Sequence, residues 1–399
     1  MITLGWILFV APIALALYTY AAYPALLAAV ARRAAAPRRT HNYIPSVSIV
    51  VPAYNEEGQI RGAIEALIAQ DYPADRRQIL VVSDASADRT DEIVGEYKAH
   101  GVELLRMPVR GGKTAAENAS CPLLRGEIII NSDSSVRFHP EAVRRLVDAM
   151  ADPSVGVAST RDVSVTRESG GSNSAEAGYV GYEMRLRRLE TRAGGIVGAS
   201  GSGYAIRAVL HRIPVKASLS RDFAAALTAR VHGYSAVSVD GAICYVPRTS
   251  SLRAEYKRKV RTIARGADTL ASHARLLDPM QSGLFGWKLL SHKVCRWLIP
   301  LLLIPAALGL LLLSKDHRWA AVLFAIAIGG GAVIGAAACW PAVWGRPPRM
   351  LVTATFAAAA NVAVVHAFMR VMFGHDDHLW EPTRRAPVTA DASHAPRGS

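Results

Sequence analysis

Acidic and basic side chains lie at predicted turns of this chain, where they could bind a phosphate ester directly or through a metal ion. Asp133 follows the β-branched run 128–130, inside a cluster of turn-forming residues at 131–135. Ligands bind at the carboxyl ends of strands in open α/β sheets, and Mg²⁺ needs few protein ligands when phosphates supply the rest. The sequence therefore predicts either a metal or ligand site at Asp133 or, more simply, a cap for the helix that begins near Pro140.

Three further features each have two candidate roles. Lys113 follows two glycines and is either a point charge for a diphosphate or a solvated turn residue, and Met107 stands where a P-loop needs its first glycine. Asp222 precedes an apolar helix and is either its cap or a general base for an acceptor hydroxyl. The basic run 253–265 is either a solvated face near anionic lipid or a clamp for a leaving diphosphate.

The elements that must position these residues alternate between strands and helices. Strands are predicted at 46–51, 78–82, 102–105 and 127–130, and helices at 60–70, at 88–100 and after Lys113. This alternation is typical of an α/β fold with a parallel, doubly wound sheet. Because carboxylates follow two of the strands, the pattern suits a nucleotide site.

Long apolar stretches flank this region. Residues 1–31 are predicted to form an N-terminal transmembrane helix, because the apolar run exceeds the roughly 20 residues that span a bilayer. The arginines behind it indicate that the following domain, residues 45–270, is cytoplasmic. Residues 284–374 are predicted to form an amphipathic interface segment and three C-terminal membrane helices, and residues 386–399 a disordered tail. The chain is thus predicted to be integral to the cell inner membrane.

Composition narrows the class of partner. The chain has 399 residues, 51% of them hydrophobic, and its 46 Lys and Arg residues exceed its 32 Asp and Glu residues. Such an excess of positive charge indicates nucleic acid, anionic lipid or phosphorylated substrates. Because no nucleic-acid-binding motif is present, we expect membrane lipids and phosphorylated substrates and no nucleic acid.

In their order and spacing, these segments resemble the membrane-integrated family 2 glycosyltransferases, inverting enzymes that include the synthases of cellulose, chitin, hyaluronan and poly-N-acetylglucosamine. The motifs that carry the resemblance stand at 52–57, 83–90, 112–118, 132–135, 220–222 and 258–262. The resemblance implies an α/β, Rossmann-like GT-A domain flanked by transmembrane helices. It also implies a hexosyltransferase that takes its sugar from a nucleotide-sugar donor, here expected to be UDP-linked.

The resemblance assigns residues to the donor. The Val-Pro-Ala-Tyr-Asn-Glu-Glu loop is similar to the family's first nucleotide-binding loop, so Tyr54, Asn55 and Glu56 are expected near the uridine. In the stretch similar to Asp-Gly-Ser-x-Asp-x-Thr, Asp84 is expected to bind the uracil or the ribose. Lys113, in the match to Gly-Lys-x-x-Ala-x-Asn, is expected near the diphosphate.

The remaining motifs concern the metal and the transfer step. Asp133 keeps the first carboxylate of the family's Asp-x-Asp motif and is the expected ligand of Mg²⁺ or Mn²⁺, while Ser135 replaces the second carboxylate. Asp222 matches the last residue of the Thr-Glu-Asp motif and is the expected catalytic base. Arg258 and Arg261 lie where processive members have Gln-x-x-Arg-Trp, and both are expected to stabilise the leaving UDP.

The class of acceptor is open at this point. The resemblance to synthases implies a polysaccharide, whereas Thr262, which stands where processive members have tryptophan, favours a single transfer to a lipid. Ser135 supports a further alternative, a catalytically degenerate domain that senses a nucleotide or assists a partner synthase. A Trp-Glu-Pro-Thr-Arg motif at 380–384 also resembles membrane members of the family.

Overall fold

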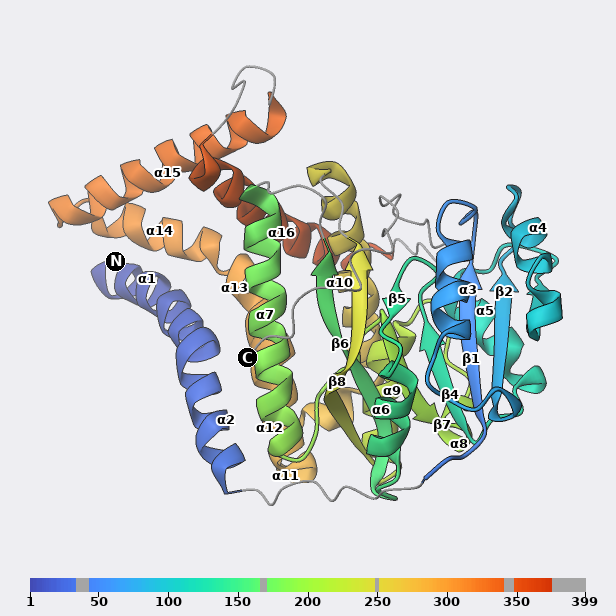
Figure 1. Ribbon diagram of the computed structural model, residues 1–399. Helices are drawn as coiled ribbons and strands as arrows, with labels where there is room; N and C mark the ends of the chain where they lie inside the picture. Colours follow the sequence, from blue (N-terminus) through green and yellow to red (C-terminus); the bar gives the residue numbers. More distant parts are fainter. Residues whose placement is uncertain (34–42, 166–170, 248–250, 341–347, 375–399) are drawn as a thin grey trace.

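The structure is a computed structural model that describes residues 1–33, 43–165, 171–247, 251–340 and 348–374. The tail predicted at 386–399 and the motif at 380–384 lie outside these residues. Two parts are visible in Figure 1: a lobe built around a β-sheet, and a group of long helices that leans away from it. The helix α7 (Gly171–Arg192) stands between them.

Eight strands of the described chain form one sheet, in the order β3-β2-β1-β4-β7-β6-β8-β5. Their bounds are β1 Val47–Ala53, β2 Arg77–Ser83, β3 Val102–Arg106, β4 Ile128–Ser132, β5 Arg137–Phe138, β6 Val155–Val165, β7 Gly203–Arg207 and β8 Ser235–Pro247. The predicted parallel arrangement is confirmed for β3, β2, β1 and β4. β7 runs antiparallel to both β4 and β6, so the sheet as a whole is mixed.

Helices cover both faces of the sheet, which explains why β1 is buried at all seven of its positions. One face packs against α3 (Ile60–Ile68), α4 (Thr90–Gly95) and α6 (Ala142–Met150). The other face packs against α5 (Lys113–Ser120), α8 (Ala208–His211) and α9 (Arg221–Val231). A strand enclosed in this way reads as a continuous apolar run, as the sequence at 47–51 does.

The sheet order brings the predicted site together. β1 pairs in register with β2 on one side and with β4 on the other, and all three run in the same direction. Their carboxyl ends therefore meet at one edge of the sheet, where Tyr54, Asp84 and Asp133 follow them in sequence. Segments 49 residues apart in sequence, such as those ending at Asp84 and Asp133, thus reach the same edge.

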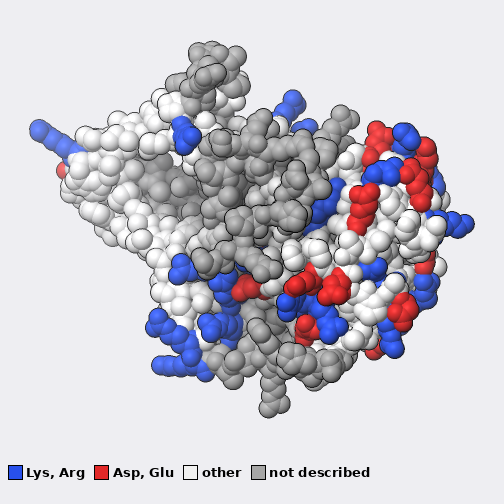
Figure 2. Space-filling model, in the orientation of Figure 1, with Lys and Arg blue, Asp and Glu red and all other residues white. Residues whose placement is uncertain are grey.

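Three helices within the described ranges are long and apolar enough to cross a membrane: 2–32, α15 (Arg318–Cys339) and α16 (Arg349–Met372). The first comprises α1 (Ile2–Leu17), a π-helical turn and α2 (Tyr23–Arg32). A fourth candidate, α12 (Leu284–Leu289) through α13 (Cys295–Leu301) to α14 (Leu303–Leu313), bends by 48° after Leu301. On the face in Figure 2, charged side chains gather over the sheet lobe and are scarce along α14 and α15.

The segment predicted to lie along the membrane interface, which begins in α12, is packed against the sheet lobe. Phe285 and Leu289 join a buried cluster with Phe223 of α9. Lys288 is 1% exposed and its ammonium donates to the backbone carbonyls of Ala193 and Gly195. Contact between this segment and lipid stays a prediction, and the segment itself joins the two parts of the protein.

Candidate active site

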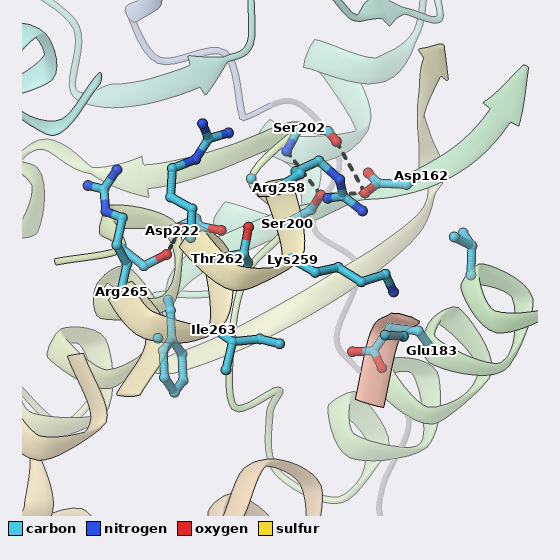
Figure 3. A pocket seen from close by; sticks show the side chains of 18 of the residues that line it. Asp162, Glu183, Ser200, Ser202, Asp222, Arg258, Lys259, Thr262, Ile263 and Arg265 are labelled. Carbon is cyan, nitrogen blue, oxygen red and sulfur yellow. Dashed lines mark hydrogen bonds between the residues drawn. The ribbon is translucent and has the colours of Figure 1, made fainter. Parts of the chain in front are cut away.

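A cavity of about 750 Å³ lies at the carboxyl edge of the sheet. Its walls come from the strand ends, from α7 and α9, from α10 (Leu252–Ser272), and from the membrane-type helices α13 and α16. Figure 3 shows side chains of α7, α9 and α10 arranged around it. Six of the nine predicted site residues line this cavity: Glu56, Lys113, Asp133, Asp222, Arg258 and Arg261.

Lys113 and Asp133 form an ion pair in the wall of the cavity. The ammonium of Lys113 lies 2.5 Å from Oδ1 of Asp133 and also donates to the carbonyl of Gly201. Burial alone would lower the pKa of Lys113, but the carboxylates of Asp133, Glu117 and Asp222 raise that pKa above its usual value. The lysine is therefore a permanent positive charge at the end of β4.

Glu117 and Arg221 form a second, deeper layer behind this pair. The Glu117 side chain is fully buried, and its Oε2 lies 3.7 Å from Nε of Arg221. Burial raises the pKa of Glu117 above its usual value. The guanidinium of Arg221 also donates to the side chain of Asn118 and to the carbonyl of His211. These bonds fix the first turn of α9 and hence the position of Asp222.

Asp222 is held at the start of α9, in the first turn. The hydroxyl of Ser220 donates to Oδ1 of Asp222 over 2.5 Å. Its other oxygen, Oδ2, lies 3.0 Å from the place where a Cβ on Gly201 would stand. Glycine at 201 therefore lets the backbone approach the carboxylate closely, and Asp222 projects into the cavity in Figure 3.

Asp84 takes a different position from the other predicted acidic residues. It is 2% exposed, and its two carboxylate oxygens accept from the backbone N–H groups of Gly111 and Gly112, each at 2.7 Å. It does not line the cavity but fixes the loop that leads into Lys113. Its predicted contact with the uracil or ribose stays a prediction.

Tyr54 and Asn55 also stand beside the cavity and do not line it. The guanidinium of Arg110 lies 3.9 Å from the centre of the Tyr54 ring. Asn55 has a left-handed backbone (φ 51°), and its Oδ1 accepts from the N–H of Ala87. These contacts join the loop after β1 to the loop after β2, so a nucleoside base approaching this edge would meet a preformed surface.

Arginines of α10 form the roof of the cavity. Arg258 makes two hydrogen bonds to the buried carboxylate of Glu255, at 2.8 and 2.6 Å. Arg265 donates to Thr114 Oγ1 and to the carbonyl of Leu219, which ties α10 to α5 and to the segment before α9. Arg261 lines the cavity between them. Arg258, Lys259, Arg261 and Arg265 of the basic run thus line the site, whereas Arg253 and Lys257 are exposed outside it, and the role as a clamp stays a prediction.

The sequence analysis missed three acidic residues of the cavity, Asp162, Glu183 and Glu255, of which Asp162 lies among the strand ends. It lies on β6, where Oδ2 accepts from the hydroxyls of Ser200 at 2.6 Å and Ser202 at 3.3 Å, as Figure 3 shows. The only signal in the sequence was a charged pair, Arg161 and Asp162, inside an otherwise apolar and hydroxyl-bearing strand. The serines lie in the glycine-rich segment 194–203, so their bonds to Asp162 hold this segment in the wall of the cavity.

The residues present fit a divalent cation that arrives with a diphosphate. No three His, Cys, Asp or Glu side chains converge on a metal site within the described residues. Asp133 offers a carboxylate that is a quarter exposed to the cavity. Mg²⁺ is commonly held by one or two carboxylates plus substrate phosphates, which is the donor set available here.

Part of the chain is similar to known proteins. Residues 48–209 match the family model described as Glycosyl transferase family 2. A relative named probable glycosyltransferase YdaM, from Bacillus subtilis, is 35% identical over 116 residues, which are 28% of this chain and 27% of that protein. The beta-monoglucosyldiacylglycerol synthase of Synechocystis is 31% identical over 121 residues, 29% of this chain and 25% of that protein. The matches thus span about a quarter of these relatives.

The fold has a counterpart among solved structures. The mannosyltransferase PcManGT of Pyrobaculum calidifontis, solved with GDP-Man and Mn²⁺, superposes with a TM-score of 0.70 at 22% identity, over 92% of this chain and all of that one. This likeness confirms the predicted GT-A fold, including helices at both ends that are apolar enough to span a membrane. The matches support the predicted class of enzyme, a transferase. Residues 48–209 thus match Glycosyl transferase family 2, and the chain has the GT-A fold.

Proposed function

We propose that this protein is a membrane-bound, inverting glycosyltransferase that moves a sugar from a nucleotide-sugar donor, UDP-linked, to a polysaccharide or lipid acceptor. One observation carries the proposal. Asp133, Lys113, Asp222 and the arginines of α10 come from distant parts of the chain and line one cavity. A carboxylate, a lysine and arginines around one space suit a diphosphate and its metal, and a second carboxylate suits a base.

The reaction follows from these positions. Asp222 accepts the proton of the acceptor hydroxyl, and the oxygen attacks the anomeric carbon on the face opposite the diphosphate. The new glycosidic bond forms as the bond from the anomeric carbon to the diphosphate breaks, and the configuration inverts. Lys113, Arg258 and Arg261 bind the leaving diphosphate and neutralise its charge. Mg²⁺ or Mn²⁺, held by Asp133, supplies further charge neutralisation when bound.

Two alternatives concern the product. The cavity is bordered by α16, a candidate membrane span, and this favours a single transfer to a lipid over growth of a polymer. Thr262 also lines the cavity, at the position where processive members have tryptophan. The chain length of the product, measured by mass spectrometry, separates the two. We place the domain on the cytoplasmic side of the inner membrane, where nucleotide-sugars are made.

The test compares three full-length proteins in lipid nanodiscs supplied with a panel of nucleotide-sugars, Mg²⁺ and mixed lipids. The wild type should release UDP and produce a glycosylated lipid or polymer. Asp222→Asn should bind UDP as tightly and lose roughly 10²- to 10⁴-fold in transfer rate, because the base is removed. Glu141→Gln, a change at the half-exposed N-cap residue of α6, is the matched control. Unchanged turnover in Asp222→Asn removes Asp222 from the mechanism, and absence of turnover with every donor supports a degenerate, nucleotide-sensing domain.

A further inference from the structure

The cavity extends beyond the expected donor site to the membrane-type helices. Six residues of α16 line it, and their spacing places them on one face of the helix: Thr353, Phe356, Ala357, Ala360, Asn361 and Val364. Trp297 and Pro300 of α13 line it from the other side. Most of these side chains are apolar, and both helices belong to candidate membrane spans. This end of the cavity suits a hydrocarbon chain.

Lys293 places a positive charge beside this apolar wall. Its side chain lies between α12 and α13, lines the cavity and is partly exposed to it. The ammonium stands 5.2 Å from the centre of the Phe223 ring, next to Asp222 in sequence. It makes no hydrogen bond and no ion pair with any residue that the structure describes. The carboxylates of Glu183 and Glu190 act on this ammonium electrostatically but form no direct ion pair with it, so an anionic group of a ligand can pair with Lys293.

Arg187 of α7, which also lines the cavity, has a guanidinium whose hydrogen-bonding capacity is not fully used. Its side chain is 10% exposed, Nε lies 3.3 Å from Oε1 of Glu183, and Nη2 reaches the carbonyl of Ala199 at 3.5 Å. Nη1 is buried and has no hydrogen-bond partner among the described atoms. Glu183 is shared, since it also accepts from Arg296 at 2.8 Å and lies 3.1 Å from His292. One carboxylate therefore serves several cationic groups.

The segment 198–201 contacts Lys293 and Arg187 at one end and lies close to Asp222 at the other. A Cβ on Gly198 would stand 3.8 Å from the Lys293 ammonium, and Arg187 bonds the next carbonyl along the chain. At the other end, Gly201 touches Asp222 and its carbonyl accepts from Lys113. Three residues span at most roughly 11 Å. The anion site and the base are thus one small head group apart, and the Lys113 ammonium that serves the donor lies at the far end of the segment.

We propose that Lys293 and Arg187 bind the phosphate of a phosphate-bearing lipid acceptor, whose apolar chain lies against α13 and α16. This assignment rests on the proposed function, because it names the acceptor class of the same site. The phosphate pairs with the Lys293 ammonium and lies beside the guanidinium of Arg187, while a hydroxyl of the head group reaches Asp222. A neutral lipid would leave the Lys293 ammonium without an ion-pair partner, so the site discriminates against it.

Binding is tested separately from catalysis. Full-length protein in dodecyl maltoside is titrated with monododecyl phosphate, and its thermal unfolding temperature is followed. The titration should raise this temperature in the wild type, in Lys293→Arg and in the control Lys315→Met, a change at an exposed lysine outside the cavity. Lys293→Met should weaken the binding about tenfold. An equal response in Lys293→Met overturns the proposal, and an equal response to inorganic phosphate alone shows that the site binds a free anion and no lipid.

Transfer gives the second readout. In nanodiscs, wild-type protein should glycosylate phosphate-bearing lipid in preference to diacylglycerol, and Lys293→Met should lose about tenfold with the first lipid only. UDP release without acceptor should be unchanged in the control Lys315→Met, whose lysine lies outside the cavity. A protein that turns over neutral and phosphate-bearing lipids alike contradicts this inference and leaves the proposed function standing. A protein that binds monododecyl phosphate through Lys293 but turns over no donor contradicts the proposed function instead.

Discussion

The ammonium of Lys113 lies 2.5 Å from Oδ1 of Asp133, at the point where the first turn of α5 meets the end of β4. The pair brings a lysine, next to the glycine turn that Asp84 clamps, against the carboxylate expected to hold the metal. A diphosphate with its cation would therefore meet a positive and a negative group at once. The pair also explains why Asp133 is not left as an isolated charge in the cavity wall.

Replacement of Lys113 should weaken donor binding. A hydrogen bond to a charged group contributes about 1.5–3 kcal/mol, so Lys113→Met should lower kcat/KM roughly 10- to 100-fold. Lys113→Arg, which keeps the charge, should recover part of the loss. Steady-state kinetics of UDP release over a range of donor concentrations measures the effect. A donor KM that is unchanged in Lys113→Met would place this lysine outside the donor site.

A methyl group at Gly201 should disturb the base. A Cβ there would stand 3.0 Å from Oδ2 of Asp222, so the carboxylate must shift by a few tenths of an ångström. Since misplacement of a reacting group by about 1 Å can cost about 10²-fold, Gly201→Ala should lower kcat about tenfold with little change in donor KM. Gly181→Ala, where nothing lies within 4 Å of the new Cβ, is the control. Equal kcat values for the two variants would separate Asp222 from the transfer step.

Replacement of Ala85 by glycine should increase the stability of the folded protein. It has a left-handed backbone, with φ 56°, in the turn directly after Asp84. This conformation costs a residue with a Cβ roughly 1–2 kcal/mol and costs glycine almost nothing. Ala85→Gly should therefore raise the unfolding temperature, with about 1 kcal/mol of added stability once the greater chain entropy of glycine is counted. Thermal unfolding in detergent checks it, and a lower unfolding temperature would mean that the turn is not under strain.

Because of the ion-pair cluster around Glu183, the stability of the fold should depend on pH in the acidic range. Burial opposes its charge, but His292, Arg296 and Arg187 hold the pKa of Glu183 well below its usual value of 4.5. A carboxylate of this kind stabilises the fold above its unfolded-state pKa, and the stabilisation is lost as the pH falls through the lower, folded-state pKa. The unfolding temperature of the wild type should fall steeply below about pH 4.5.

Glu183→Gln separates this cluster from general acid unfolding. Loss of one partner of a buried pair costs about 3–5 kcal/mol, so the variant should be less stable at pH 7 and approach the wild type as the pH falls. Glu141→Gln removes an exposed partner and should change stability by less than about 1 kcal/mol. Unfolding curves of the three proteins, measured between pH 3 and 7 at intervals of about one pH unit, test this prediction. A constant difference between Glu183→Gln and the wild type at every pH would contradict it.

The strand and helix pattern of the nucleotide-binding half was predictable because each strand is an apolar run followed by turn residues. β1, β2 and β4 appear where the sequence indicated them, and so do the acidic residues behind β2 and β4. The long strand β8 (Ser235–Pro247) has no such signal, because it is held by pairing with β6 along most of its length and the local sequence does not show that pairing. The antiparallel β7 has the same cause, since strand direction is set by distant partners.

The sequence by itself determined which residue types are available: a lysine behind two glycines, aspartates after strands, a basic helix and apolar stretches at both ends. Only the tertiary structure decided how they are used. In the fold, Asp84 accepts hydrogen bonds from backbone amides, and Asp162 of β6 lines the cavity. Lys293 and Arg187 both lie next to residues 198–199. The physical reason is that hydrogen bonds and ion pairs act over a few ångströms, whereas these residues lie tens to hundreds of positions apart.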